Sequence, residues 1–125
     1  MAGVYIHIPF CKQACYYCNF HFSTSLRLKN ELISALLNEI ELRSTQADDE
    51  IIQTIYFGGG TPSLLSMDDV NLILSSLNKH YNISDSPEIS LEANPDDISI
   101  EKLNAWKNAG IIRLSIGIQS FIERD

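Results

Sequence analysis

Residues 88–121 read EISLEANPDDISIEKLNAWKNAGIIRLSIGIQSF, and this segment carries one strand–helix–strand unit. Apolar and polar residues alternate over residues 88–94 and again over 111–121, which is the period of a β-strand. Between the two strands, Ser99 is suited to cap the start of a helix and Gly110 to end it in a left-handed conformation. The segment predicts two parallel strands joined by a helix.

The chain before this unit has the same order of elements. Residues 4–8 and 51–57 have strand character, and apolar residues recur at helical spacing over 28–40 and over 70–77. The helix over 70–77 is predicted to begin at Ser66 as its N-cap, with two aspartates in its first turn. Residues 81–87 are predicted to form a polar connection. Alternating strands and helices are typical of parallel βα units, so the sequence predicts an α/β fold.

The predicted strands are polar on one side, whereas parallel strands covered on both faces are usually apolar throughout. One face is shared by Arg113, Ser115, Gly117 and Gln119 in the last strand, and by Glu88, Ser90, Glu92 and Asn94 in the strand before it. A curved, barrel-like sheet around a polar ligand explains this pattern. Four strands cannot close a barrel, and the chain stops directly after a strand. We therefore expect residues 1–125 to be the N-terminal part of a larger core domain, about half of a barrel.

Composition narrows the functional class. The 125 residues are 45% hydrophobic and carry nine Lys and Arg against sixteen Asp and Glu, a net charge of -7. This acidic balance argues against direct binding of nucleic acid. No apolar run reaches the roughly 18 to 20 residues of a transmembrane helix. The three cysteines are an odd number and favour a reducing compartment, so we expect a cytoplasmic protein.

The strongest chemical signal is the C-x3-C-x2-C spacing of Cys11, Cys15 and Cys18, directly after the first strand. Thiolates this close in the chain can converge on one iron–sulfur cluster. The main alternative is a structural zinc site, which needs a fourth ligand that His21 would supply. The spacing favours iron and sulfide and leaves zinc open.

Four ordered blocks carry a resemblance to a known family. They are YIHIPFCKQACYYC at residues 5–18, YFGGGTPS at 56–63, SLEANPDD at 90–97 and RLSIGIQSF at 113–121. With these blocks the chain resembles the radical SAM superfamily, and within it the coproporphyrinogen dehydrogenase family with its HemW-like heme chaperone branch. The resemblance implies a TIM-barrel-like partial barrel and a 4Fe-4S cluster held by three cysteines. It also implies that S-adenosylmethionine (SAM) binds the fourth iron, and that an electron from the cluster cleaves it to a 5'-deoxyadenosyl radical.

The resemblance also implies the residues that bind SAM. They are Tyr5, Tyr17 near the adenine, Gly59, Gly60 and Thr61 at the methionine end, Glu92 at the ribose and Gln119 at the nucleoside. Structural roles remain as alternatives. The two tyrosines would then pack, the glycines would make a tight turn, and Glu92 would be a rim carboxylate paired with a basic residue. Arg113 would then neutralise Glu92 or Glu88.

One departure distinguishes the branches of the family. In the coproporphyrinogen-oxidising members another cysteine follows the third one after two positions, and here that position is Phe20. The difference favours the heme chaperone branch, with heme or a porphyrin as partner of the full-length protein and a reductant that the sequence does not identify. The alternatives are an oxygen-independent coproporphyrinogen III oxidase making protoporphyrinogen IX and, more remotely, a zinc-stabilised non-enzymatic interaction module or a radical SAM enzyme acting on RNA.

Overall fold

The computed structural model describes residues 2–8, 22–47, 50–59, 62, 65–93, 95 and 98–116. The elements in chain order are β1 (Ala2–Ile8), α2 (Phe22–Leu42), α3 (Ser44–Ala47), β2 (Ile51–Gly59), α4 (Met67–His80), β3 (Asn82–Ala93), α5 (Ile100–Ala109) and β4 (Arg113–Ile116). The strands form one sheet in the order β1-β2-β3-β4, and every neighbouring pair is parallel. The predicted α/β fold of parallel βα units is confirmed.

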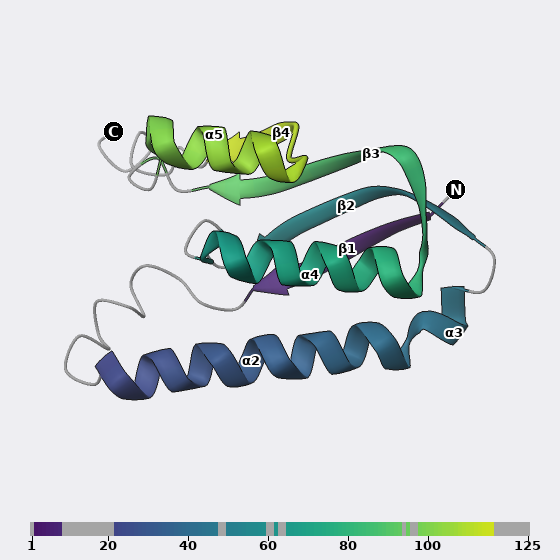
Figure 1. The fold of residues 1–125 in the computed structure, drawn as a ribbon, viewed down its shortest axis with the longest axis horizontal. Coiled ribbons are helices and arrows are strands. Elements are labelled where there is room, and N and C mark those ends of the chain that lie inside the picture. Colours follow the sequence, from purple (N-terminus) through teal and green to yellow (C-terminus); the bar gives the residue numbers. More distant parts are fainter. Residues whose placement is uncertain are drawn as a thin grey trace, which may run out of the picture.

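The core lies between the sheet and the helices, which Figure 1 shows on one side of the strands. Each strand contributes its apolar face. Ile8, Phe57 and Leu91 are fully buried there, and the helices add residues such as Val70 and Trp106. Since alternate strand residues point to opposite faces, packing this face leaves the polar residues on the other side of the sheet.

The predicted helix ends are confirmed. The Ser66 hydroxyl accepts a hydrogen bond from the backbone N–H of Asp69 at 3.1 Å, and the Ser99 hydroxyl accepts from Lys102 at 3.1 Å. Each satisfies a backbone donor that the first turn of a helix leaves without a partner. Gly110 ends α5 with a φ of 102°, a conformation that glycine adopts at little cost.

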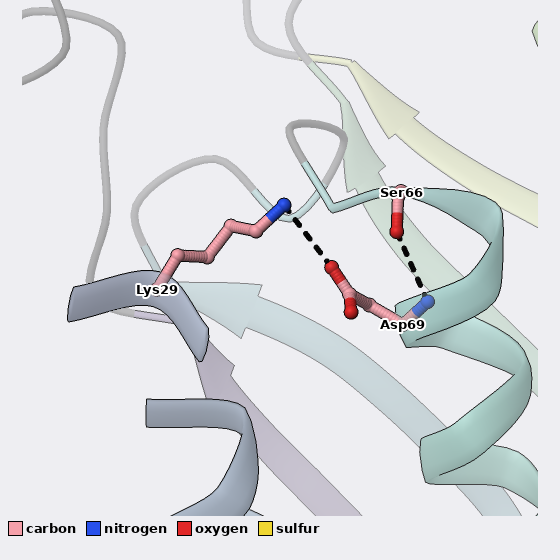
Figure 2. A network of polar contacts seen from close by, with 3 residues as sticks. All are labelled: Lys29, Ser66 and Asp69. Carbon is pink, nitrogen blue, oxygen red and sulfur yellow. Dashed lines mark hydrogen bonds and ion pairs between the residues drawn. The ribbon is translucent and has the colours of Figure 1, made fainter. Parts of the chain in front are cut away.

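Two polar contacts join α2 to α4 and the segment after it. Lys29 lies 3.2 Å from a carboxylate oxygen of Asp69, beside the Ser66 cap (Figure 2). Toward the other end of α2, the Tyr81 hydroxyl donates to the carbonyl of Ile40 at 2.9 Å. The Asp69 side chain is only 13% exposed, so the ammonium of Lys29 compensates a carboxylate that is largely withdrawn from water. These contacts fix the two helices that follow β1 and β2.

The polar connection predicted over residues 81–87 is wrong. β3 begins at Asn82, which pairs with Ile51, and the register then shifts so that Thr54 pairs with Glu88. Residues 84–87 therefore stand opposite Gln53 alone. A bulge of this kind admits a proline within a strand, because its missing N–H is not needed in the ladder.

The last strand is observed over Arg113–Ile116. Of its predicted span, residues 111–112 precede the strand and residues 117–121 lie outside the described residues. In the part of the chain that the structure describes, no helix is both long and apolar enough to cross a membrane.

Candidate functional site

The candidate site is the polar face of the sheet, opposite the helices. Its described side chains come from all four strands, namely Tyr5 and His7 from β1, Tyr56 from β2, Glu88, Ser90 and Glu92 from β3, and Arg113 and Ser115 from β4. Tyr5 is 58% exposed, so this face is open to solvent rather than packed as a second core. The predicted alternation is confirmed for the described positions. Asn94, Gly117 and Gln119 lie outside them.

Glu92 is the best-anchored charged group on this face. The Tyr56 hydroxyl donates to Oε2 of Glu92 at 2.8 Å, and the backbone N–H of Gly59 donates to Oε1 at 3.1 Å. Among the described residues, the donors to this carboxylate therefore come from β2 and not from a basic side chain. Each carboxylate oxygen can accept more than one hydrogen bond, so Glu92 retains acceptor capacity for a ligand.

Arg113 belongs to the rim of the face. Its guanidinium lies 2.8 Å from Oε2 of Glu88, and both side chains are well exposed. Of the two alternatives for Arg113, neutralisation of Glu88 is the one observed. An exposed pair of this kind contributes at most about 1 kcal/mol.

Tyr56 was not among the predicted site residues. Its ring stacks on Tyr5 with centroids 5.6 Å apart and planes 12° apart. The hydrogen bond to Glu92 raises the pKa of Tyr56 above its ordinary value, and burial acts in the same direction, while a hydrogen bond with Ser115 lowers it. The hydroxyl therefore stays protonated and remains a donor at neutral pH. Strand alternation could have placed Tyr56 on the polar face, but its partner depends on the register between β2 and β3.

Gly58 and Gly59 lie where β1 and β2 end together, opposite His7 and Ile8. Gly59 has a φ of 110°, and a Cβ atom on it would lie 2.6 Å from the carbonyl oxygen of Ile8. A Cβ atom on Gly58 would lie 2.6 Å from the hydroxyl of Tyr5. Gly59 requires glycine both for space, because the Ile8 carbonyl cannot move away, and for its backbone conformation, whereas a side chain at Gly58 would displace the rings of Tyr5 and Tyr56. The end of β1, from which the chain continues toward Cys11, is thus held against Gly59.

The remaining predicted site residues lie outside the described part of the chain. They are Cys11, Cys15, Cys18, Tyr17, Gly60, Thr61 and Gln119, together with His21 of the zinc alternative. Within the described ranges, no three His, Cys, Asp or Glu side chains gather as a metal site. Of the predicted SAM-binding residues, the structure brings Tyr5, Gly59 and Glu92 to one end of the same sheet face, linked through Tyr56.

Comparison with known proteins identifies the family. The Radical SAM superfamily model matches residues 5–124, nearly the whole chain. The chain belongs to the radical SAM superfamily. Membership implies a 4Fe-4S cluster and SAM as the general cofactors of the superfamily, as the four sequence blocks suggested.

Several relatives place this radical SAM chain more closely. The heme chaperone HemW of Bacillus subtilis is 39% identical over 123 residues, which cover 97% of this chain and 32% of the relative. HemW of Escherichia coli is 38% identical over 126 residues, with 97% and 32% covered. The chain spans about a third of the length of these curated relatives.

A solved structure supports the fold. Coproporphyrinogen III oxidase (HemN) from Escherichia coli, described as a radical SAM enzyme, superposes with a TM-score of 0.77 at 26% identity. The match covers 99% of this chain and 31% of that protein. The four parallel strands in sequential order are therefore part of a radical SAM barrel, which confirms the predicted partial barrel.

Proposed function

We propose that this chain is the N-terminal part of the core domain of a HemW-like heme chaperone. In this proposal Cys11, Cys15 and Cys18 hold a 4Fe-4S cluster, and SAM binds across the open sheet face. The observation that carries the proposal is the anchoring of Glu92 by Tyr56 and Gly59 beside the end of β1. This arrangement puts an oriented carboxylate and a crowded glycine next to the strand that leads into the cysteine segment.

The described residues fit a nucleoside-containing cofactor. Glu92 offers an acceptor for ribose hydroxyls, since its two donors among the described residues leave part of its capacity unused. Gly59, having no Cβ atom, allows a ligand to approach its backbone closely. Tyr5 presents an exposed ring on the same face. The roles of Tyr17, Gly60, Thr61 and Gln119 in SAM binding extend this proposal to residues that the structure does not describe.

The chemistry divides between cofactors and protein. Bound together, the cluster and SAM supply the electron transfer that cleaves the sulfonium C–S bond. The described side chains have another task, which is to orient the nucleoside and to hold it beside the cysteine segment. An ordered carboxylate does this better than a mobile one, because less side-chain entropy is lost when the ligand binds.

Two observations favour the chaperone branch. Phe20 stands where the oxidising members have a further cysteine, and the relatives at 38 to 40% identity that we compared are heme chaperones. Heme or a porphyrin is therefore the proposed partner of the full-length protein, in the cytoplasm, where the three thiols stay reduced. The second candidate is an oxygen-independent coproporphyrinogen III oxidase, which the structural match to HemN favours.

Metal analysis and spectroscopy test the cofactor assignment. After anaerobic reconstitution of the full-length protein, we expect about four irons and four sulfides per chain, and an EPR signal of the reduced cluster that changes on addition of SAM. A Cys11→Ala, Cys15→Ala, Cys18→Ala triple variant should lose both. One zinc per chain without iron or sulfide would overturn the assignment in favour of the interaction module.

A second assay separates the two candidates. The reconstituted protein is incubated with coproporphyrinogen III, SAM and a reductant, and protoporphyrinogen IX and 5'-deoxyadenosine are measured. The chaperone assignment predicts heme binding and transfer without protoporphyrinogen IX. Formation of that product in step with 5'-deoxyadenosine would contradict it and identify the oxidase.

A further inference from the structure

Tyr56 connects the aromatic and the acidic parts of the open sheet face. Its ring stacks on Tyr5, and its hydroxyl donates to Glu92 at 2.8 Å. We propose that Tyr56 is a positioning residue that holds the Glu92 carboxylate in the orientation needed to bind the two ribose hydroxyls of SAM. The inference rests on the proposed SAM site and assigns to that site a residue that does not itself contact the cofactor.

The sheet register explains why a tyrosine is needed. Tyr56 lies opposite Ser90 of β3, whereas its hydrogen-bond partner is Glu92, two residues further along the same face. Residues two apart on a strand are separated by roughly 6.5 Å, so only a long side chain with a terminal donor spans this diagonal. Ser90 between them is small and nearly buried, at 7% exposure. A phenylalanine at position 56 would keep the ring but lose the donor.

The neighbours of Tyr56 restrict where its hydroxyl lies. The ring is nearly parallel to that of Tyr5, and the neighbouring Ser115 of β4 acts to lower the pKa of the hydroxyl. Gly58 leaves the space that both rings occupy, since a Cβ atom there would lie 2.8 Å from Cε1 of Tyr56. Because the pKa of Tyr56 is raised above its ordinary value, the hydroxyl stays protonated and remains a donor at neutral pH.

Two fixed contacts orient a carboxylate better than one. Gly59 holds Oε1 and Tyr56 holds Oε2, which restricts rotation of the carboxylate of Glu92. A vicinal diol needs both oxygens in a defined plane, because its two hydroxyls donate side by side. Loss of the Tyr56 donor frees one oxygen. The effect should therefore be greater for a ligand with ribose hydroxyls than for one without them.

The test compares two non-reactive probes, S-adenosylhomocysteine and its 2',3'-dideoxy analogue. Their dissociation constants are measured by calorimetry on the full-length protein. We expect Tyr56→Phe to weaken S-adenosylhomocysteine binding about tenfold, the order expected for a hydrogen bond to a charged group. Binding of the dideoxy analogue should change less than about twofold. The preference for S-adenosylhomocysteine is the dissociation constant of the dideoxy analogue divided by that of S-adenosylhomocysteine. In Tyr56→Phe this ratio should fall toward its value in Glu92→Gln.

Tyr81→Phe is the matched control, because it also removes one tyrosine hydroxyl with a protein acceptor, the Ile40 carbonyl, away from the open face. It should leave both dissociation constants and their ratio unchanged. Circular dichroism verifies the fold of each variant. Should Tyr56→Phe not fold, Tyr56→Leu replaces it, since it removes the same donor to Glu92 and should lower the same ratio.

The outcomes are distinguishable. If the wild-type protein prefers S-adenosylhomocysteine and Glu92→Gln abolishes the preference, but Tyr56→Phe retains it, the positioning role is overturned and the SAM site stands. Equal weakening of both probes by Tyr56→Phe also overturns the role, because it indicates a general structural effect. A wild-type protein that binds neither probe overturns the SAM site and this inference together.

Discussion

Replacement of Gly59 by alanine should destabilise the protein more than the same replacement at Gly110, although both residues have a positive φ. Their φ angles are nearly equal, at 110° and 102°. Their surroundings differ. A Cβ atom on Gly59 would lie 2.6 Å from the backbone carbonyl oxygen of Ile8, whereas one on Gly110 would meet only a methyl group of Ile89 at 3.6 Å. The pair therefore separates backbone strain from crowding.

The expected magnitudes follow from these two terms. A non-glycine residue in the left-handed region costs about 1–2 kcal/mol, and this applies to both variants. Crowding against an atom that cannot rotate away costs a further 1–3 kcal/mol or so, and this applies only at Gly59. Alanine also reduces the entropy of the unfolded chain by a similar amount at both positions, so this effect cancels in the comparison. The free energy of unfolding should thus fall about 1–3 kcal/mol further for Gly59→Ala.

Urea unfolding, followed by the fluorescence of the buried Trp106, measures the difference. With a slope of about 2 kcal/mol per molar urea, the midpoint of Gly59→Ala should lie on the order of 1 M below that of Gly110→Ala. Gly59→Ala should also weaken SAM binding, since the displaced N–H no longer reaches Glu92, and Gly110→Ala should not. Equal midpoints for the two variants would refute the crowding argument.

Three further predictions concern the helical side of the molecule. Lys29→Met should lower the free energy of unfolding by about 1–2 kcal/mol, because it leaves the largely buried Asp69 carboxylate without a cation. Arg43→Gln is the control, because it removes an ion pair whose side chains are 62% and 54% exposed, and it should cost under about 0.5 kcal/mol. Equal losses of the two variants in urea unfolding would contradict the burial argument. Ser99→Ala should cost about 1 kcal/mol and speed amide exchange in the first turn of α5, and unchanged exchange would show that the cap is unimportant. Burial raises the pKa of Tyr81, so the protonated hydroxyl contributes its full stabilisation below about pH 10, and this is lost as pH rises through the pKa of the folded state. Tyr81→Phe should therefore flatten the decline of the free energy of unfolding at alkaline pH. The same decline in the variant and in the wild-type protein would count against this.

The polar side chains of the open sheet face make contacts that differ from those of the core on the other side of the sheet. Among the described residues, Tyr5, His7 and Glu88 make ring contacts and an exposed ion pair on the open face. An exposed ion pair contributes at most about 1 kcal/mol to folding and a stacked aromatic pair about 0.5–1.5 kcal/mol. On the same face, Gly59 and Glu92 lie at the carboxyl ends of parallel strands, which is the usual position of a ligand site in an α/β fold.

Local patterns in the chain were enough to predict the class of fold, the helix caps and the chemical character of each sheet face. Ser66, Ser99 and Gly110 act through backbone groups within a few residues, so their effect can be read locally. The alternation of polar and apolar residues in β3 likewise predicted which side would face the helices. The family resemblance followed from blocks of adjacent residues, for which no three-dimensional information is needed.

Which polar groups meet could be seen only with the strands aligned in three dimensions. The partner of Glu92 depends on the register of β2 against β3, and that register contains a shift that no local pattern in the chain reveals. The start of β3 at Asn82 was missed for the same reason, because a bulge of polar residues resembles a connection until its neighbouring strand is in place. Local sequence fixes backbone conformation and the direction of side chains, whereas contacts between residues 36 apart depend on how the strands are aligned.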